Sequence, residues 1–210
     1  MRIAILTCST PNRKWLYDLT NRTKEKYCAI HNMDYIFSDS FYPVSDRHPY
    51  WNKIKFICDN LPKFDWVLWM DDDAGFVSNE SIEPIFNTDK EFLYATDMNG
   101  FNAGVMGVKN TMKMRCSFAF IWLKMYDSFK NNQFPEQDAI RKLIIDDLKL
   151  GAFIDGKKYN AYEQSLTKCD INQADANTII LHIAGGSWFK ETHQNEIRAL
   201  YETYLQKPFG

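Results

Sequence analysis

An unbroken apolar run that ends in three carboxylates is the clearest pattern in the chain. Trp66 to Met70 are all large and apolar, and Asp71, Asp72 and Asp73 follow directly. A run of this length without polar alternation predicts a strand that is buried on both faces of a mainly parallel sheet. Because ligands of open α/β sheets bind beyond the carboxyl ends of the strands, the three aspartates lie where a ligand is expected.

Further short apolar runs alternate with helical patterns along the chain. Strands are predicted at 2–7, 35–37, 92–95, 102–108 and 178–183, helices at 12–30, 50–61, 114–125, 135–148 and 197–205, and an irregular polar stretch at 151–175. This alternation predicts an α/β fold, a three-layer α/β/α domain around a mainly parallel central sheet. No internal repeat or linker divides the chain, so we expect one domain over residues 1–210. This domain could also be one part of a longer protein.

Composition narrows the class of protein. The chain has 210 residues, 45% hydrophobic and 25% charged, as globular proteins do. Its net charge of −2 gives no basic surface for nucleic acid. No apolar stretch reaches the roughly 18–20 residues of a membrane helix, and the first strand begins too early for a signal peptide. The five cysteines are scattered and odd in number, which indicates neither a zinc site nor a disulfide framework. We therefore expect a cytoplasmic location.

The negative charge of the three aspartates must be compensated, because adjacent carboxylates repel one another. A divalent cation supplies this compensation, since hard cations take carboxylate oxygens. Asp71 and Asp73 lie on the same side of an extended chain, so both can reach one cation, or one can bind the metal and the other a ribose hydroxyl. The alternative is a solvated acidic turn.

His182 is the second candidate for metal binding. It lies in the last predicted strand, before the pair Gly185 and Gly186, with Lys190 a little further on. Imidazole is a good ligand for ions like Mn²⁺, although a buried histidine of the core is equally compatible with the local pattern. The glycines would let backbone amides approach a phosphate, and Lys190 could reach the same anion or lie on the surface.

Three other stretches carry candidate polar groups. Thr7-Cys8-Ser9 follows the first strand, as at the opening of a nucleotide-binding α/β domain, and the absence of a Gly-x-Gly-x-x-Gly motif disfavours a dinucleotide. Gln137-Asp138 could cap a helix or face a sugar. Asn102 could belong to a turn or bond a sugar hydroxyl, and Gly104 would let another group approach the backbone closely.

Taken in order, the motifs resemble those of the GT-A glycosyltransferases, specifically the galactosyl-, mannosyl- and xylosyltransferase family, glycosyltransferase family 34. The chain is similar in particular to the amino-terminal glycosyltransferase domain of a chlorella-virus protein, from Arg2 to about Lys190. The set comprises Tyr50-Trp51-x-Lys53, Trp66-Val67-Leu68-Trp69-Met70-Asp71-x-Asp73-Ala74, Phe101-Asn102-Ala103-Gly104, Gln137-Asp138-Ala139 and His182-x-Ala184-Gly185.

The resemblance implies a GT-A fold and retaining transfer from a UDP-sugar to a glycan or glycoprotein acceptor. Mn²⁺ or Mg²⁺ would be held by Asp71, Asp73 and His182, with Asp71 on the metal or the ribose. The nucleotide would contact Thr7, Cys8, Ser9, Lys53 and Asp72, the diphosphate Gly185 and Lys190, and the donor sugar Asn102, Ala103, Gln137 and Asp138. Retention would arise either by front-face attack or through a covalent intermediate on a carboxylate such as Asp138.

The chain departs from the family at Asp72, where a small polar residue is usual, and after Ala184. Family members of the eukaryotic Golgi also carry an amino-terminal anchor. Two other classes compete: a phosphohydrolase with an Asp-x-Asp motif, and a non-catalytic sugar-nucleotide or glycan-binding module. A calcium loop is disfavoured because the twelfth position from Asp71 is Ile82. The sequence leaves the sugar, the acceptor and the oligomeric state open.

Overall fold

A six-stranded sheet forms the centre of the computed structural model, which describes residues 1–39, 47–163, 166, 171–184 and 192–207. The strand order is β2-β1-β3-β6-β5-β7, and β6 runs against the other five strands. The strands are β1 (Ile3–Cys8), β2 (Asp34–Ser38), β3 (Trp66–Met70), β5 (Phe92–Asp97), β6 (Gly100–Lys109) and β7 (Gly151–Phe153). The predicted mainly parallel sheet is confirmed.

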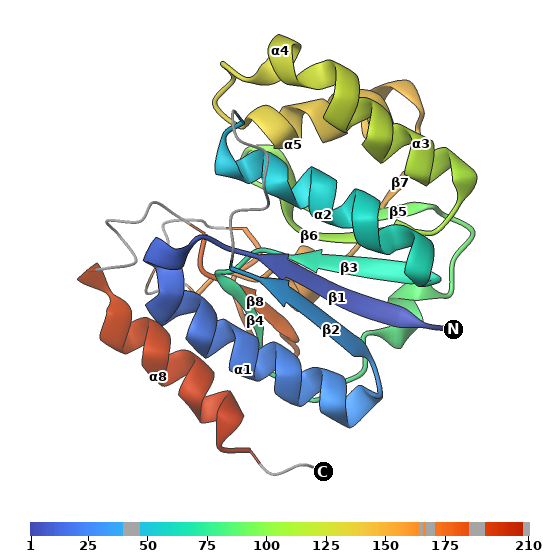
Figure 1. The fold of residues 1–210 in the computed structure, drawn as a ribbon. Coiled ribbons are helices and arrows are strands. Elements are labelled where there is room, and N and C mark those ends of the chain that lie inside the picture. Colours follow the sequence, from blue (N-terminus) through green and yellow to red (C-terminus); the bar gives the residue numbers. More distant parts are fainter. Residues whose placement is uncertain (40–46, 164–165, 167–170, 185–191, 208–210) are drawn as a thin grey trace.

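Helices cover both faces of this sheet (Figure 1). The helices are α1 (Lys14–His31), α2 (Asn52–Asn60), α3 (Met112–Phe120), α4 (Tyr126–Phe129), α5 (Pro135–Ile140), α6 (Gly156–Tyr159) and α8 (Gln194–Leu205). Helices α2 to α5 lie over one face, and α1 with α8 beside it lies over the other (Figure 1). The three-layer α/β/α architecture is therefore also confirmed.

The central strand β3 is buried on both faces, as its unbroken apolar run predicts. Val67 and Trp69 pack into the hydrophobic cluster under α2, α3 and α5. Trp66, Leu68 and Met70 point the other way, into the cluster that includes side chains of α1. Alternate residues of one strand thus contribute to two hydrophobic layers, and the aspartates emerge where both layers end.

A second, two-stranded sheet follows the aspartates. It pairs β4 (Ala74–Phe76) antiparallel with β8 (Ile180–His182), and Ala74 lies opposite His182. The strand predicted at 178–183 is therefore shorter than expected and joins this small sheet instead of the central one. The pairing brings His182 beside the aspartates, although more than a hundred residues separate them in sequence.

The predicted irregular stretch at 151–175 needs a correction. It contains the edge strand β7 and the short helix α6. Each has only three or four residues, so neither the period of a strand nor that of a helix is visible in the sequence. Within the ranges that the structure describes, no helix combines the length and apolar character that crossing a membrane requires.

Candidate active site

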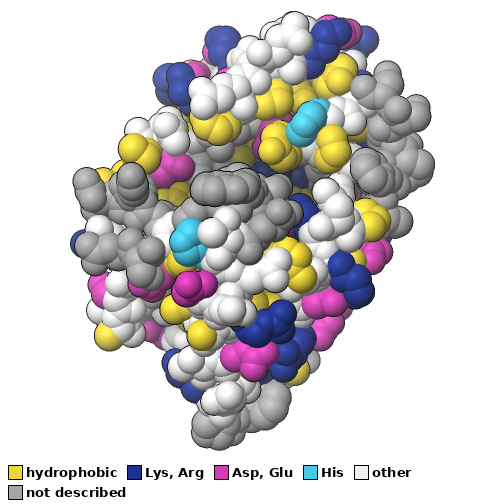
Figure 2. Space-filling model, turned by 90° about the vertical axis from the view of Figure 1, so that its left-hand side faces the viewer, with side chains coloured by type: hydrophobic (Ala, Val, Ile, Leu, Met, Phe, Trp, Pro, Cys, Tyr) yellow, Lys and Arg dark blue, Asp and Glu magenta, His cyan; other side chains and the backbone are white. Residues whose placement is uncertain are grey.

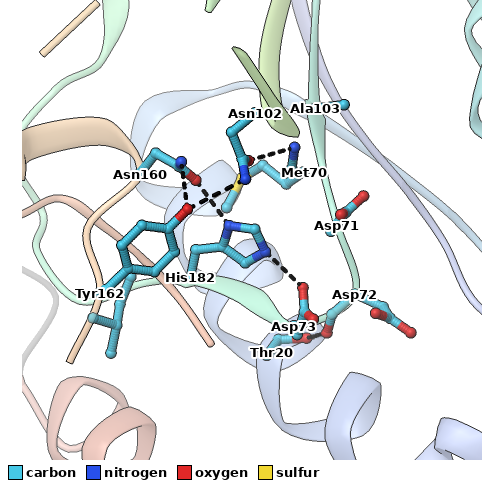
Figure 3. Close-up of polar contacts among 12 residues, drawn as sticks. Thr20, Met70, Asp71, Asp72, Asp73, Asn102, Ala103, Asn160, Tyr162 and His182 are labelled. Carbon is cyan, nitrogen blue, oxygen red and sulfur yellow. Dashed lines mark hydrogen bonds and ion pairs between the residues drawn. The ribbon is translucent and has the colours of Figure 1, made fainter. Parts of the chain in front are cut away.

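Asp71, Asp73 and His182 come together at the carboxyl end of β3 (Figure 3). One side-chain oxygen from each aspartate and one ring nitrogen of the histidine all lie within 4.8 Å of one another. The turn that carries the aspartates is fixed by its backbone: the N–H of Asp71 donates to the carbonyl of Gly104 at 2.8 Å, and that of Ala74 to the carbonyl of Asp71 at 3.1 Å. Two carboxylates and an imidazole could hold a divalent metal ion.

The orientation of the His182 ring supports a cation at this place. Its Nδ1 lies 2.9 Å from Oδ1 of the buried Asn160, and because an amide oxygen only accepts, Nδ1 carries the proton. Nε2 then directs its lone pair toward Oδ1 of Asp73, 3.1 Å away. A lone pair and a carboxylate oxygen at this distance repel each other unless a proton or a metal ion compensates, so the donor set fits a metal.

Gly104 makes room for this ring. A Cβ at Gly104 would meet the Cε1 and Nδ1 atoms of His182, with Nδ1 only 2.8 Å away, and Oδ1 of Asn102 at 2.9 Å. The group for which the sequence predicted close approach to Gly104 is therefore the imidazole of His182. β6 needs a glycine here so that a side chain from the small sheet can reach the aspartates.

Asp72 does not belong to the metal-binding group, because its carboxylate is bound by other side chains of the protein. Its carboxylate accepts from the Ser9 hydroxyl and, at 2.7 Å, from Nη2 of Arg13, which also lies 3.2 Å from Oδ2 of Asp73. In Figure 3 the Asp72 side chain points away from His182. Burial opposes the charge of Arg13, but Asp73 and Asp72 outweigh it and raise the pKa of Arg13. The extra charge at the middle position of the motif is thus neutralised within the protein.

Lys53 compensates Asp71 from the opposite wall. Its buried ammonium lies 3.1 Å from Oδ1 of Asp71 and 3.3 Å from Oε1 of Glu136, and it donates to the carbonyl of Ala103 at 3.1 Å. Burial alone would lower the pKa of Lys53, but the two carboxylates outweigh it and the pKa is raised. For Glu136, burial dominates over the attraction of Lys53 and raises the pKa of the carboxyl. Trp69 completes the contacts of Asp71 through an indole N–H at 2.7 Å.

These groups line a cavity of about 450 Å³. Its lining contains Cys8, Ser9, Lys53, Asp71, Asp72, Asp73, Asn102, Gln137 and His182, all singled out from the sequence, and also Arg13, Tyr50, Phe134 and Glu136, whose roles the sequence did not indicate. A cavity of this size falls in the range of small-ligand sites. A basic residue soon after the first strand and a carboxylate beside Gln137 were visible in sequence, but nothing in their spacing assigned them to the site.

Three predicted residues do not line this cavity. The hydroxyl of Thr7 donates to the carbonyl of Met70 at 2.9 Å and ties β1 to β3. Ala103 uses its backbone only, with its N–H donating to Oε1 of Gln137 at 3.0 Å. The carboxylate of Asp138 accepts from the side-chain amide of Asn132 at 2.8 Å. Gly185 and Lys190 lie outside the described residues.

Asn102 lines the cavity, but its side chain forms hydrogen bonds with other residues of the protein. Its amide nitrogen donates to Oδ2 of Asp97 at 2.7 Å and to the hydroxyl of Tyr162 at 3.2 Å, and its oxygen accepts from the N–H of Gly104 at 2.8 Å. The hydroxyl of Tyr162 also lies 3.4 Å from the amide of Asn160 (Figure 3). Asn102 and Asn160 thus form one network that supports His182.

Comparison with known proteins gives matches in sequence. Residues 2–87 match the profile of the galactosyl transferase GMA12/MNN10 family. Galactomannan galactosyltransferase 1 of Cyamopsis tetragonoloba is 26% identical over 162 residues, which are 61% of this chain and 36% of that protein. The match therefore spans about a third of the length of this relative.

Solved structures share the fold over nearly the whole chain. A glycosyltransferase involved in the glycosylation of the major capsid of PBCV-1 superimposes with a TM-score of 0.75 at 18% identity, covering 96% of this chain and 99% of that one. GlyE of Streptococcus pneumoniae TIGR4 gives 0.66 at 15% identity, covering 100% and 61%, and the galactosyltransferase LgtC gives 0.57 at 14%, covering 98% and 97%. The chain therefore has the GT-A fold of these solved glycosyltransferases, and its residues 2–87 are similar to the galactosyl transferase GMA12/MNN10 family.

Proposed function

We propose that the protein transfers a sugar from a UDP-sugar to a hydroxyl group of a glycan, in a metal-dependent reaction. The observation that carries this proposal is the convergence of Asp71, Asp73 and His182, from two distant stretches, in one cavity. The sequence relative is a galactosyltransferase by name, and LgtC was solved in complex with donor and acceptor sugar analogs. These likenesses support a nucleotide sugar as the donor and a glycan as the acceptor.

The donor set favours Mn²⁺, with Mg²⁺ as the alternative, because an imidazole stands beside two carboxylates. When bound, such an ion neutralises the charge that develops on the leaving diphosphate. Asp71, Asp73 and His182 would hold it. Arg13 and Lys53 form ion pairs with Asp72 and Asp71 and so add positive charge around the motif.

In the transfer, the bond between the anomeric carbon and the phosphate oxygen breaks, and a bond to the acceptor oxygen forms. The acceptor's hydroxyl proton leaves with the released UDP. Cys8 and Ser9 line the cavity at the end of β1, where we place the nucleoside. Burial, helped by Asp71, raises the pKa of the Cys8 thiol to about 12, so Cys8 stays neutral and acts as a contact surface.

Retention of configuration is part of the proposal. A covalent route needs a carboxylate that reaches the anomeric carbon. The carboxylate of Asp138 is bonded to Asn132 and does not line the cavity, and that of Glu136 is paired with Lys53. This arrangement favours front-face attack over an intermediate on Asp138.

The test is release of UDP from a panel of UDP-sugars with Mn²⁺, with Mg²⁺ and with chelator, for the wild type, Asp73→Asn and the exposed control Asp89→Asn. Metal-dependent release that Asp73→Asn loses, by about 10²- to 10³-fold, and Asp89→Asn keeps is the expected result and would name the donor. No turnover combined with a UDP- and metal-dependent rise in melting temperature would indicate the non-catalytic binding module. No effect of nucleotide or metal would refute the proposed donor site.

A further inference from the structure

We propose that Tyr50 and Phe134, here called the aromatic platform, hold one pyranose ring of the acceptor glycan, with Glu136 as a hydrogen-bond acceptor for its hydroxyls. This inference rests on the proposed transferase function and adds the position and chemistry of its second substrate. Tyr50 belongs to the turn Pro49–Trp51, and Phe134 directly precedes α5. Both rings and Glu136 line the cavity that contains the metal-binding group.

The exposure of the aromatic platform is the first observation. Tyr50 is 54% exposed and Phe134 is 37% exposed. Single exposed apolar residues are common and need no explanation, but two aromatic rings on the lining of one functional cavity do. Figure 2 shows hydrophobic side chains gathered near a histidine on this face of the molecule. An apolar surface open to water at this place is available for a ligand.

The aromatic platform is also held rigidly. Tyr50 follows Pro49 and Phe134 precedes Pro135, so proline restricts the backbone next to each ring. The ring of His48 packs against that of Tyr50 with centroids 4.3 Å apart. The turn Pro49–Trp51 and α5 contact each other, which keeps the two segments together. A ligand would therefore lose little binding energy to ordering these side chains.

The chemistry of the aromatic platform matches a neutral sugar. A pyranose ring presents C–H groups on its faces and hydroxyl groups on its edges, so it needs an apolar surface together with hydrogen-bond acceptors. Glu136 is 6% exposed, and its Oε2 has no hydrogen-bond partner among the described residues, while Oε1 is paired with Lys53. A buried carboxylate oxygen without a partner is costly, and a sugar hydroxyl would satisfy it.

Charge assigns this part of the lining to the acceptor and not to the nucleotide. A nucleoside diphosphate is anionic, and a divalent cation held by Asp71, Asp73 and His182 would match that charge. The aromatic platform itself is uncharged. Because Tyr50 and Phe134 each lie within three residues of Lys53 or Gln137, a ring held there lies next to the groups that surround the reacting centre.

The test is saturation-transfer NMR with UDP and Mg²⁺ present, irradiating the aromatic protons. The probes are the methyl α- and β-pyranosides of glucose, galactose, mannose and xylose. We expect at least one pyranoside to receive saturation on its ring C–H protons. Tyr50→Ala and Phe134→Ala should weaken its binding about ten-fold, Tyr50→Phe should keep it, and the control Phe120→Ala should leave it unchanged. Phe120 is 50% exposed, similar to Tyr50, but does not line the cavity.

The outcomes separate the two proposals. If UDP binds to the wild type neither with Mg²⁺ nor with Mn²⁺, the proposed function is wrong and the acceptor role of the aromatic platform falls with it. If UDP binds but no pyranoside receives saturation, or the alanine variants bind the pyranoside as the wild type does, only the aromatic platform is refuted. Equal losses of UDP and pyranoside affinity in Tyr50→Ala would also refute it, because the change would then act on the whole cavity.

Discussion

At the scale of single residues, the direction of His182 depends on Asn160. Replacing Asn160 by Ala removes the acceptor of the Nδ1 proton and leaves the imidazole free to change tautomer or rotate. We expect the affinity for Mn²⁺ in the presence of UDP to fall about 10- to 100-fold. Titration of Mn²⁺ followed by electron paramagnetic resonance measures this. The exposed control Asn177→Ala should bind as the wild type does, and an unchanged affinity in Asn160→Ala would contradict the role given to it.

Some residues of the site could be predicted from the sequence and others could not. Asp71 and Asp73 were readable because three charges follow an apolar run, and His182 because it ends another run. Arg13 and Asn160 were not, because each acts through contacts with residues that lie far away in the sequence. An arginine after a turn or an asparagine in a polar stretch is ordinary in sequence, and only the fold gives either residue its partner.

At the scale of elements, the site requires β6 and β8 to approach closely at Gly104. In Gly104→Ala the new methyl group would collide with the His182 ring and displace it from the aspartates. We expect loss of Mn²⁺ affinity of at least about 10-fold, as for other changes that disturb ligand orientation. Calorimetric titration of Mn²⁺ in the presence of UDP measures the affinity.

Gly107→Ala is the matched control for Gly104→Ala. Gly107 lies on the same strand, and a Cβ there would crowd Leu93 and Phe86, which are core residues away from the aspartates. We expect this variant to lower the melting temperature while keeping its metal affinity. Equal losses of affinity in both variants would mean that β6 acts only through stability.

Helix α8 supports the small sheet through Tyr201. Its buried hydroxyl donates to the carbonyl of Leu181 at 2.8 Å and lies 3.2 Å from that of Asp73. Tyr201→Phe leaves both carbonyls without this donor, so we expect the free energy of unfolding to fall by about 1–3 kcal/mol in urea denaturation. Tyr204 is equally buried, but its hydroxyl has no hydrogen-bond partner among the described residues, so Tyr204→Phe should cost nothing. A similar loss in both variants would contradict this account.

Most of the elements that the sequence predicted have enough residues to show a period. The apolar run of β3 and the helical face of α1 extend over at least one full repeat, and both are present. β4 and β7 have three residues each and were not predicted. The partner of β8 was also not predictable, because pairing with β4 depends on the turn at the aspartates and not on any pattern in β8.

At the scale of the whole molecule, the central sheet joins two hydrophobic layers. Residues of β1 and β3 alternate between the cluster under α2 and the cluster under α1, so neither layer can lose its packing without exposing the same strands. If residues 1–210 form a single domain, as the sequence predicts, the two layers should therefore unfold together.

Two cysteines, one in each layer, test this cooperativity. Cys28 belongs to the cluster under α1, and Cys58 packs against the cluster under α2. Burial raises the pKa of each thiol to about 12, so at pH 8 only about one in 10⁴ is the reactive thiolate, against roughly one in four or five for an unfolded thiol. Iodoacetamide should label the exposed Cys116 in the native protein and leave Cys28 and Cys58 protected.

With increasing urea at pH 8, we expect Cys28 and Cys58 to become reactive at the same urea concentration, because unfolding removes the burial that raises both pKa values. Labelling pulses followed by peptide mass spectrometry measure each site separately, and Cys116 serves as the control that reacts throughout. Exposure of Cys58 at clearly lower urea than Cys28 would show that the layer of α2 to α5 unfolds independently. The chain would then consist of two cooperative units that share a sheet, and the single-domain prediction would be wrong.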